Sequence, residues 1–450
     1  MKKIFGAVSL SVLGLAVFPC QGEVVHRTSA AAPAASGYDP VQRCLDLVQL
    51  NLAGKIAPAL HVASRAVQSP PKDLPIHCLA GHLNEIKSAL KNQIENCERK
   101  SAEEKAQTFQ FGCRMVKNED YCLNANTEML KIASLPNMNY VTFVNRAARE
   151  FDWYESNGSQ GNDGKFKTGT TRLTGYYSPT AVEAAADPSD AYPYPIYAAP
   201  DGLTYFEILS RSWGRAAVST RSPKFQSIGA LAIKTAPTPH SPLASRSLRA
   251  PWMGKAGRSL ISEVFMMFLE GAGSVNLRLK DGSIESVILN FAGKNARPNN
   301  MIGDVLKCEN KKIKGSLAAY YARHPNEAYR DTVHYNPSTV FYQPGVSYEG
   351  VDHIPITPNA SIATDPTSIP TGTVTLINVP ATNACNTSSS MTVAQDIGGR
   401  IKGAHVDRYT GAGPVAGTKA ESFNDSGLIF MAVPKGAGSP VRDCASKTAN

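Results

Sequence analysis

The chain has 450 residues, of which 42% are hydrophobic and 18% charged, and its formal net charge is +9. This length and composition predict an ordinary globular protein of two or three domains. The mild basic excess suits an anionic polymer or a membrane surface without identifying either. No basic run is interleaved with aromatic residues, so nucleic acid is not an expected partner.

The first 22 residues have the pattern of a secretory signal peptide. Two lysines are followed by an uncharged stretch, residues 4–18, and then by small and polar residues. We expect cleavage after Gly22. The alternative is a lipid anchor at Cys20, although the residues before it fit a lipobox poorly. No later stretch is long and apolar enough to cross a bilayer, so no transmembrane span is expected in the mature chain.

Eight cysteines remain once Cys20 is set aside. An even number in an exported chain favours disulfides over metal ligands, and no CxxC pair argues for zinc. Five of the eight precede residue 123, so if all are paired, at least one bond must join the N-terminal region to the rest. The disulfide candidates are Cys44, Cys78, Cys97, Cys113, Cys122, Cys308, Cys385 and Cys444.

The N-terminal third of the mature chain changes from a linker to a helical pattern. Residues 23–40 are rich in Ala, Ser and Pro and predict a flexible linker. From residue 41 to 155 the apolar residues recur at helical spacing, as at Leu83, Ile86, Leu90 and Ile94. This pattern predicts a small helical domain braced by disulfides. Its role stays open between packing and docking to a protein partner of unknown identity.

After residue 155 the pattern becomes β-rich, with short apolar runs and many Gly and Pro residues. The sequence KDG at 280–282, between two alternating runs, predicts a hairpin. One helix is expected at 315–330. The segments expected to form strands are 171–179, 192–200, 274–293 and 338–343.

Three aspartates stand at the ends of apolar runs near the C-terminus: Asp365, Asp396 and Asp407, each with Gly or Pro close by. Glycine permits close approach of loops, so acids at strand ends can converge on one pocket. The alternative is that Asp beside Pro or Gly only makes turns.

The segments IATDPTSIPTG, AQDIGGRIKG and HVDRYTGAG around these acids resemble the three-aspartate domain of the MltA family of lytic transglycosylases. Further pieces resemble that family in the same order upstream. They are LTGYYSP, YPIYAAP, FLEGAGSVNLRLKDG, FAGKNARPNNMIGDVL and NPSTVFY. The resemblance covers roughly residues 165–435 and does not extend to 41–155.

The resemblance implies a mainly β fold, a split double-psi β-barrel with an inserted β-rich domain and a groove for a glycan strand between them. The barrel is expected to combine 165–180 with 335–435, the insert to span 181–334, and a tail to span 436–450. The helical domain would precede both.

The resemblance also implies an enzyme that cleaves the β-1,4 bond between N-acetylmuramic acid and N-acetylglucosamine in peptidoglycan and leaves 1,6-anhydromuramoyl ends. By its place in the motif, Asp407 would act first as acid and then as base, without a cofactor. A free aspartic acid titrates near 3.9, so its pKa must be raised. Asp396 and Asp365 are the expected catalytic companions.

Several further residues are expected to face substrate. Tyr176 or Tyr177 would stack on a sugar, or be an ordinary core aromatic, and Gln395 would bind substrate or only close the barrel. His405, alone beside an acid, is not expected to bind a metal. The residues predicted to bind substrate are Thr174, Gly175, Tyr176, Gln395, Gly398, Gly399 and Lys402.

Some positions depart from the family's pattern. Glu270 to Gly273 replace a usual QGSG, Ile397 replaces a Thr and Arg400 an Ala, so subsite preference or catalytic efficiency is expected to differ. The competing hypotheses are a non-catalytic peptidoglycan-binding protein with an expansin-like barrel, and a hydrolase. In each case an exported protein of the periplasm or cell envelope is expected.

Overall fold

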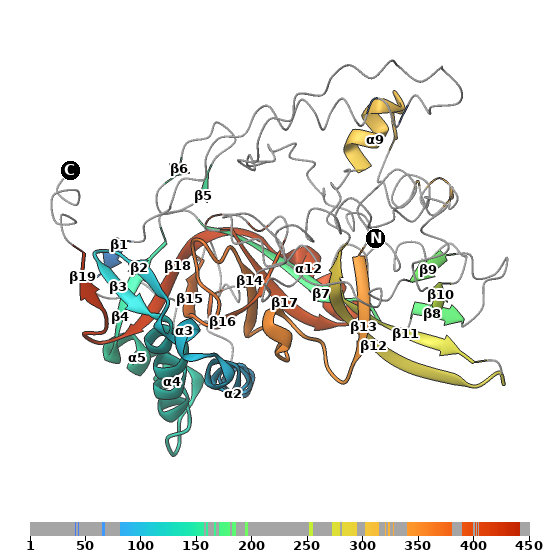
Figure 1. Cartoon of the computed structure of the whole chain (residues 1–450). Coiled ribbons are helices and arrows are strands. Elements are labelled where there is room, and N and C mark those ends of the chain that lie inside the picture. Colours follow the sequence, from blue (N-terminus) through green and yellow to red (C-terminus); the bar gives the residue numbers. More distant parts are fainter. Residues whose placement is uncertain are drawn as a thin grey trace, which may run out of the picture. The chain divides into compact units, whose positions relative to one another are not determined.

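The structure is a computed structural model. It describes residues 82–156, 171–180, 272–294, 302–314, 340–379, 389–398 and 401–441, with gaps at 280, 402 and 404, and short pieces at 41, 44, 65–67, 159–160, 166–167, 182–185, 194–196, 252–254, 320, 323–324 and 327. The chain forms two compact units (Figure 1). One combines His61–Thr180 with Gly345–Asn450, and the other contains Ala181–Pro344 and the residues up to Leu60.

Six strands of the described residues close into a barrel, in the order β18, β15, β16, β14, β17, β7 and back to β18. Closure depends on β18, which pairs antiparallel with β7 through its first residues and with β15 through its middle. The strands are β7 (Thr171–Ser178), β14 (Ser361–Thr364), β15 (Val374–Asn378), β16 (Ser390–Ile397), β17 (Val406–Ala412) and β18 (Asn424–Pro434). A mainly β fold with a barrel built from two distant segments confirms the predicted fold class.

The barrel strands are apolar because both of their faces are covered. In β15 every residue is buried, with Val374 and Leu376 on one face and Ile377 on the other. Such strands have near-continuous apolar runs. Between β17 and β18 lies α12 (Pro414–Ser422), which packs against β7 and β17.

Helices cover one face of the barrel strands (Figure 1). The predicted apolar stripe of residues 83–94 lies in α2, where Ile86 and Leu90 are fully buried in one core with Val393 and Phe430 of the barrel. The helical elements here are α2 (Leu83–Arg99), α3 (Ala102–Ala106), the π-helical η2 (Glu119–Asn124), α4 (Ala125–Ala133) and α5 (Tyr140–Glu150). The helices therefore share a hydrophobic core with the barrel.

The helical pattern expected to run through residues 140–155 ends earlier than predicted. Helix α5 stops at Glu150, and Phe151–Glu155 form β4, which pairs with β18. Phe151 and Trp153 belong to the core that the barrel shares with the helices, while Tyr154 belongs to a second core with Leu173 and Ile362. Side chains that alternate between two faces have the period of a strand. Pairing with the barrel and the strand preference of aromatic residues override the helical pattern.

Short strands extend this unit. β4 also pairs with β1, and a three-stranded sheet is formed by β2, β3 and β19. The bounds are β1 (Arg65–Val67), β2 (Thr108–Phe111), β3 (Arg114–Lys117), β5 (Ser159–Gln160), β6 (Phe166–Lys167), the 3-10 helix η4 (Val351–His353) and β19 (Ser439–Pro440).

The second unit contains a six-stranded sheet in the order β13, β12, β11, β8, β10, β9. β11 and β12 form the hairpin predicted from KDG, with Gly282 at φ +83°, where glycine is preferred. The elements are β8 (Val182–Ala185), β9 (Tyr194–Ile196), β10 (Trp252–Gly254), β11 (Gly273–Arg278), β12 (Ile284–Lys294), α9 (Ile302–Cys308) and β13 (Val340–Gly345). Most of the helix expected at 315–330 lies outside the described residues.

Two disulfides have both cysteines within the described residues. Cys44–Cys308 joins the N-terminal region to α9, which confirms that at least one bond links that region to the rest, and Cys97–Cys122 joins α2 to η2. Cys113 is also disulfide-bonded. The remaining candidates, Cys78, Cys385 and Cys444, lie outside the described residues. No helix among the residues described is long and apolar enough to span a membrane.

Candidate functional site

Strand register places two of the three aspartates in one row with Thr174. Asp407 of β17 pairs with Thr174 of β7 on one side and with Ala363 of β14 on the other. Ala363 in turn pairs with Asp396 of β16. Since neighbouring strands lie about 4.8 Å apart, the backbones of the two aspartates are roughly 10 Å apart.

A β-bulge turns Asp396 toward the face of Asp407. Ile362 pairs with Ala394, but the next residue, Ala363, pairs with Asp396, so Gln395 is an extra residue in β16. Strict alternation would put Asp396 on the same face as Ala394, which belongs to the core of the barrel strands. A bulge re-aims the side chains beside it, and here it brings the two carboxylates onto one face.

Both carboxylates have specific hydrogen-bond donors. The Thr174 hydroxyl donates to Asp407 Oδ1 over 2.8 Å, and its oxygen lies 2.9 Å from His405 Nε2. The Tyr176 hydroxyl donates to Asp396 Oδ2 over 2.9 Å, and the backbone N–H of Ile397 donates to Asp396 Oδ1 over 2.8 Å. Asp407 therefore belongs to a chain of three side chains, whereas Asp396 is held by a phenol and a backbone amide.

Burial raises the pKa of Asp407 from 3.8 to about 7. The hydrogen bond from Thr174 lowers this pKa, while the charge of Asp396 raises it and that of Arg172 lowers it. Loss of solvation penalises the charged carboxylate and is the largest of these effects. A group with a pKa near neutrality both donates and accepts a proton readily, which suits a single acid and base.

Tyr176 stays protonated beside Asp396. Burial and the Asp396 charge raise the pKa of the Tyr176 phenol well above its usual value, so it remains a donor. Its ring packs against Tyr409, with ring centroids 5.3 Å apart. Both tyrosines belong to a small core with Ala363 and Ile401 that lies on the same face as the acids.

Comparison with known proteins places this site in a family. A family model described as the 3D domain matches residues 360–431, and one described as the MltA specific insert domain matches residues 172–343. Together they cover more than half of the chain. The chain belongs to the MltA family of lytic transglycosylases. Thr174, Asp407 and Asp396 pair in one row, called here the acid row. The two segments that form it lie inside or overlap these matches; they are β7 and β14–β17.

Curated relatives agree with this assignment. The chain is 28% identical over 281 residues to membrane-bound lytic murein transglycosylase A of Escherichia coli strain K12, covering 60% of this chain and 67% of the relative. It is 28% identical over 276 residues to the protein of the same name from Vibrio cholerae, covering 59% of this chain and 66% of the relative.

Solved structures share the fold. The Escherichia coli MltA structure with bound chitohexaose matches with a TM-score of 0.52 and 22% identity, covering 84% of this chain and 96% of that chain. The membrane-bound lytic murein transglycosylase from Agrobacterium tumefaciens matches with a TM-score of 0.57 and 18% identity, covering 83% and 98%.

The third aspartate of the MltA pattern has a different environment. Asp365 is buried, and its Oδ1 accepts hydrogen bonds from the backbone and the hydroxyl of Thr367, while its Oδ2 accepts from the backbone N–H of Gly403. These bonds close a turn after β14 and hold the loop before β17. We therefore interpret Asp365 as a support for the loop that leads to Asp407.

Several predicted substrate-facing residues lie in packed positions. A Cβ on Gly175 would lie 2.8 Å from the Phe423 ring and 2.9 Å from the Ala420 backbone, so this glycine lets β7 approach α12. A Cβ on Gly398 would lie 2.4 Å from Ile401. Tyr176 is mostly buried, in line with the core-aromatic alternative. Gly399 and Lys402 lie outside the described residues.

Gln395 is fully buried and its side chain contacts helix α2, part of the helical region formed by α2–α5 and η2. This placement agrees with the alternative that it closes the barrel, and it leaves no exposed atom for a ligand. The contact between His405 and Thr174 is not among the predictions made from the sequence. The signal was available, because His405 stands two residues before Asp407, where alternation along an extended chain places both on one face.

Of the residues that depart from the MltA pattern, Ile397 lies within the described part of the chain. Ile397 ends β16 and gives its backbone N–H to Asp396, so the replaced side chain is not needed for that contact. Glu270 and Arg400 lie outside the described residues. Within the residues described, no group of three or more His, Cys, Asp and Glu residues is arranged to hold a metal ion.

Proposed function

We propose that this chain is a lytic transglycosylase that cleaves the β-1,4 bond between N-acetylmuramic acid and N-acetylglucosamine in peptidoglycan. Membership of the MltA family and the names of its curated relatives support this activity and the murein substrate. The observation that carries the proposal is the carboxyl group of Asp407, whose pKa is raised to about 7 beside Thr174 and Asp396.

The reaction needs one carboxyl group. Protonated Asp407 gives its proton to the glycosidic oxygen, the bond from that oxygen to C1 of the muramoyl sugar breaks, and C1 takes oxocarbenium character. The C6 hydroxyl of the same sugar then attacks C1, and the Asp407 carboxylate accepts the hydroxyl proton. Asp407 returns to its protonated form, water is not consumed, and the product ends in a 1,6-anhydro ring.

The surroundings of Asp407 suit both halves of this cycle. A pKa of about 7 leaves about half of the molecules protonated at neutral pH, ready to donate. The Thr174 hydroxyl stabilises the carboxylate that exists between the two steps, because a hydrogen bond to a charged acceptor is stronger than one to a neutral group. The like charge of Asp396 counteracts this and favours the return of the proton.

Asp396 is not needed as a second reacting carboxylate. Ordinary glycosidases use one carboxyl group as acid and another as nucleophile or as base for water. Both oxygens of Asp396 accept hydrogen bonds, from Tyr176 and from the Ile397 backbone, which suits a fixed negative charge. The intramolecular hydroxyl replaces the nucleophile, and no cofactor is required.

Digestion of purified sacculi tests the activity and its product together. We expect muropeptides with anhydro ends, detected by mass spectrometry after separation, and no such product from Asp407→Asn. Reducing ends would indicate hydrolysis, and sacculi that bind the protein but stay intact would indicate the alternative of a wall-binding protein with an expansin-like barrel. Either result would overturn the proposal.

We also propose that the protein acts in the cell envelope. The N-terminal signal-peptide pattern supports export, and the curated relatives are named as membrane-bound. Fractionation of cells with an antibody to the mature chain tests this, because recovery of the protein in the cytoplasm with its first 22 residues still attached would contradict it.

A further inference from the structure

Gln395 is tied from both ends of its side chain. Its Oε1 accepts a hydrogen bond of 2.6 Å from the Ser361 hydroxyl in β14. Its Nε2 donates over 3.0 Å to the backbone oxygen of Ala89 in α2, and a longer contact of 3.4 Å reaches Gln93 Oε1. Because the side chain is fully buried, loss of the Ser361 hydroxyl, or of both acceptors of Nε2, would leave a buried polar atom without these bonds. The amide thus joins a barrel strand to a helix.

The backbone of Gln395 is also confined. A Cβ placed on Gly350 would lie 2.3 Å from the backbone oxygen of Gln395, so the segment before η4 packs directly on the bulge. Helix α2 supports that segment through the residues after η4, because Asn92 Nδ2 donates to the backbone oxygen of Pro355 over 2.9 Å, and Pro355 forms a β-bridge with Glu349, next to Gly350. The bulged residue is therefore fixed by α2 directly and by a segment that α2 supports.

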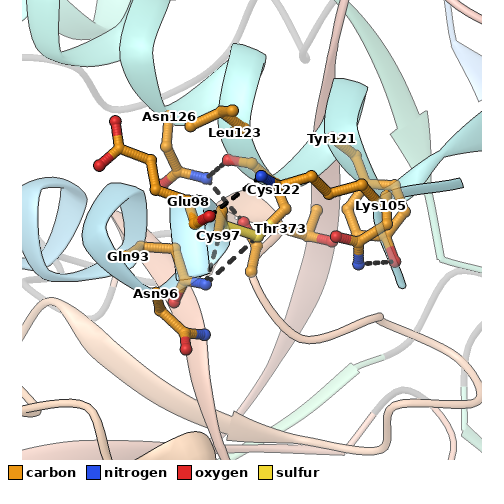
Figure 2. The surroundings of a disulfide bond; sticks show 12 residues. Gln93, Asn96, Cys97, Glu98, Lys105, Tyr121, Cys122, Leu123, Asn126 and Thr373 are labelled. Atoms are coloured by element: carbon orange, nitrogen blue, oxygen red, sulfur yellow. Dashed lines mark hydrogen bonds between the residues drawn. A yellow bond between two sulfur atoms is a disulfide. The ribbon is translucent and has the colours of Figure 1, made fainter. Parts of the chain in front are cut away.

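The Cys97–Cys122 disulfide lies beside Gln93 (Figure 2). Gln93 Nε2 donates to the sulfur atoms of Cys97 and Cys122 over 3.3 and 3.4 Å. The Cys122 sulfur lies 2.5 Å from where a Cβ on Gly372 would be, and the Gly372 N–H donates to the backbone oxygen of Ala394 over 2.7 Å. Disulfide, helix and barrel strand thus meet at the two residues that precede Asp396.

We propose that Gln395 is a positioning residue, which ties α2 to the bulge of β16 and thereby keeps the Asp396 carboxylate on the face of Asp407. The inference rests on the proposed function for its catalytic meaning. It also gives a role to α2, which lies outside both segments matched by the family models. The helical region would thus help to set the proton affinity of the reacting acid.

The test replaces Gln395 with methionine, which keeps the length and volume of the side chain but removes its hydrogen bonds. Once Asp396 is free to turn away, its charge raises the pKa of Asp407 less, so this pKa should fall by roughly 0.5. The cleavage rate should then be almost unchanged at pH 5 and about threefold lower at pH 8. Titration of the Asp407 carboxyl carbon by 13C NMR measures the pKa directly, with the signal assigned by its loss in Asp407→Asn.

A matched control separates positioning from stability. Asn118 is another buried amide of the helical region, and its Nδ2 donates to the Tyr121 hydroxyl over 2.8 Å. Asn118→Leu should lower the melting temperature without moving the pKa of Asp407. If Gln395→Met and Asn118→Leu lower stability alike and neither moves that pKa, the positioning role is wrong.

A double mutant gives an independent check. In the background of Asp396→Asn, Gln395→Met should change neither the Asp407 pKa nor the pH–rate profile further, since the charge it positions is gone. An additional shift of the same size in that background would overturn the inference. If Gln395→Met does not fold, the milder Gln93→Met, which leaves the bond to Ala89 intact, should give a smaller shift in the same direction, and no shift would contradict it.

The NMR readout keeps the two proposals apart. A lowered Asp407 pKa in Gln395→Met, in a chain that leaves murein intact, would retain the positioning role and reject the proposed function. Murein cleavage with an unchanged Asp407 pKa would do the reverse.

Discussion

The hydroxyl of Thr174 in β7 donates a hydrogen bond of 2.8 Å to the carboxylate of Asp407 in β17, across a parallel strand pair that joins the two distant segments of the barrel. The same hydroxyl oxygen lies 2.9 Å from His405 Nε2. A threonine hydroxyl has one proton, so when it donates to Asp407, the imidazole is the group that donates to it. His405 thus favours the orientation of Thr174 that stabilises the carboxylate.

Thr174→Val should raise the pKa of Asp407, because it removes a hydrogen bond that favours the charged form. A hydrogen bond to a charged group contributes about 1.5 kcal/mol or more, so the basic limb of the pH–rate profile should move up by about 1 pH unit. The cleavage rate on murein as a function of pH measures this. Thr375→Val is the control. The Thr375 hydroxyl is buried and hydrogen-bonded to the Thr392 hydroxyl, on the face of the barrel strands opposite to that of Asp407. It should cost stability and leave the limb in place.

Asp396→Asn should move the same limb in the opposite direction. Removing the like charge takes away a contribution that raises the Asp407 pKa, so activity should decline at a lower pH than in the wild type. At an effective dielectric constant near that of a protein surface, the expected displacement is roughly 0.5 to 1 pH unit. A limb that moves upward would show that Asp396 acts on Asp407 other than through its charge.

The sequence predicted the strands of the acid row better than the aim of its side chains. The motifs around Asp396, Asp407 and Thr174 end or begin short apolar runs, and those runs are strands in the structure. Alternation alone would have put Asp396 on the core face of β16. The bulge at Gln395 depends on pairing with β14, so no local pattern predicts it.

The helical region illustrates a second limit. The stripe in α2 predicts a buried face, and Ile86 and Leu90 are indeed fully buried. An apolar stripe does not specify its partner, so the packing of α2 on β16 could not be derived from the sequence. In the same way, Phe151–Glu155 continues a helical pattern but becomes a strand, because β18 offers it a pairing edge.

Asp407→Asn should stabilise the folded protein above neutral pH. The Asp407 pKa is raised from 3.8 to about 7, so between these values the folded state holds a proton that the unfolded state has lost, and wild-type stability decreases as pH rises through this window. The difference corresponds to an upper limit of about 4 kcal/mol. Asparagine has no such charge to bury.

Thermal or urea unfolding at two pH values measures this effect. The melting temperature of Asp407→Asn should exceed that of the wild type at pH 8 and come close to it at pH 3.5, where the wild-type carboxyl is mostly protonated in both states. Equal gains at both values would mean that the variant stabilises by a route unrelated to the proton.

Asp365→Ala should destabilise the loop that Asp365 holds before β17 without shifting the pH dependence of cleavage. The variant leaves three donors without their charged acceptor, namely the Thr367 backbone and hydroxyl and the Gly403 backbone. The expected loss in the free energy of unfolding is about 2 to 4 kcal/mol, measured by urea titration at pH 7. Asp281→Ala is a close control, because Asp281 accepts the same pair of bonds from Ser283 in an exposed turn. Its loss in the free energy of unfolding should be much smaller, since water replaces the acceptor there.

Under conditions in which Asp365→Ala is folded, the basic limb of its pH–rate profile should keep the wild-type position. A displaced limb would instead assign Asp365 to the reacting carboxylates.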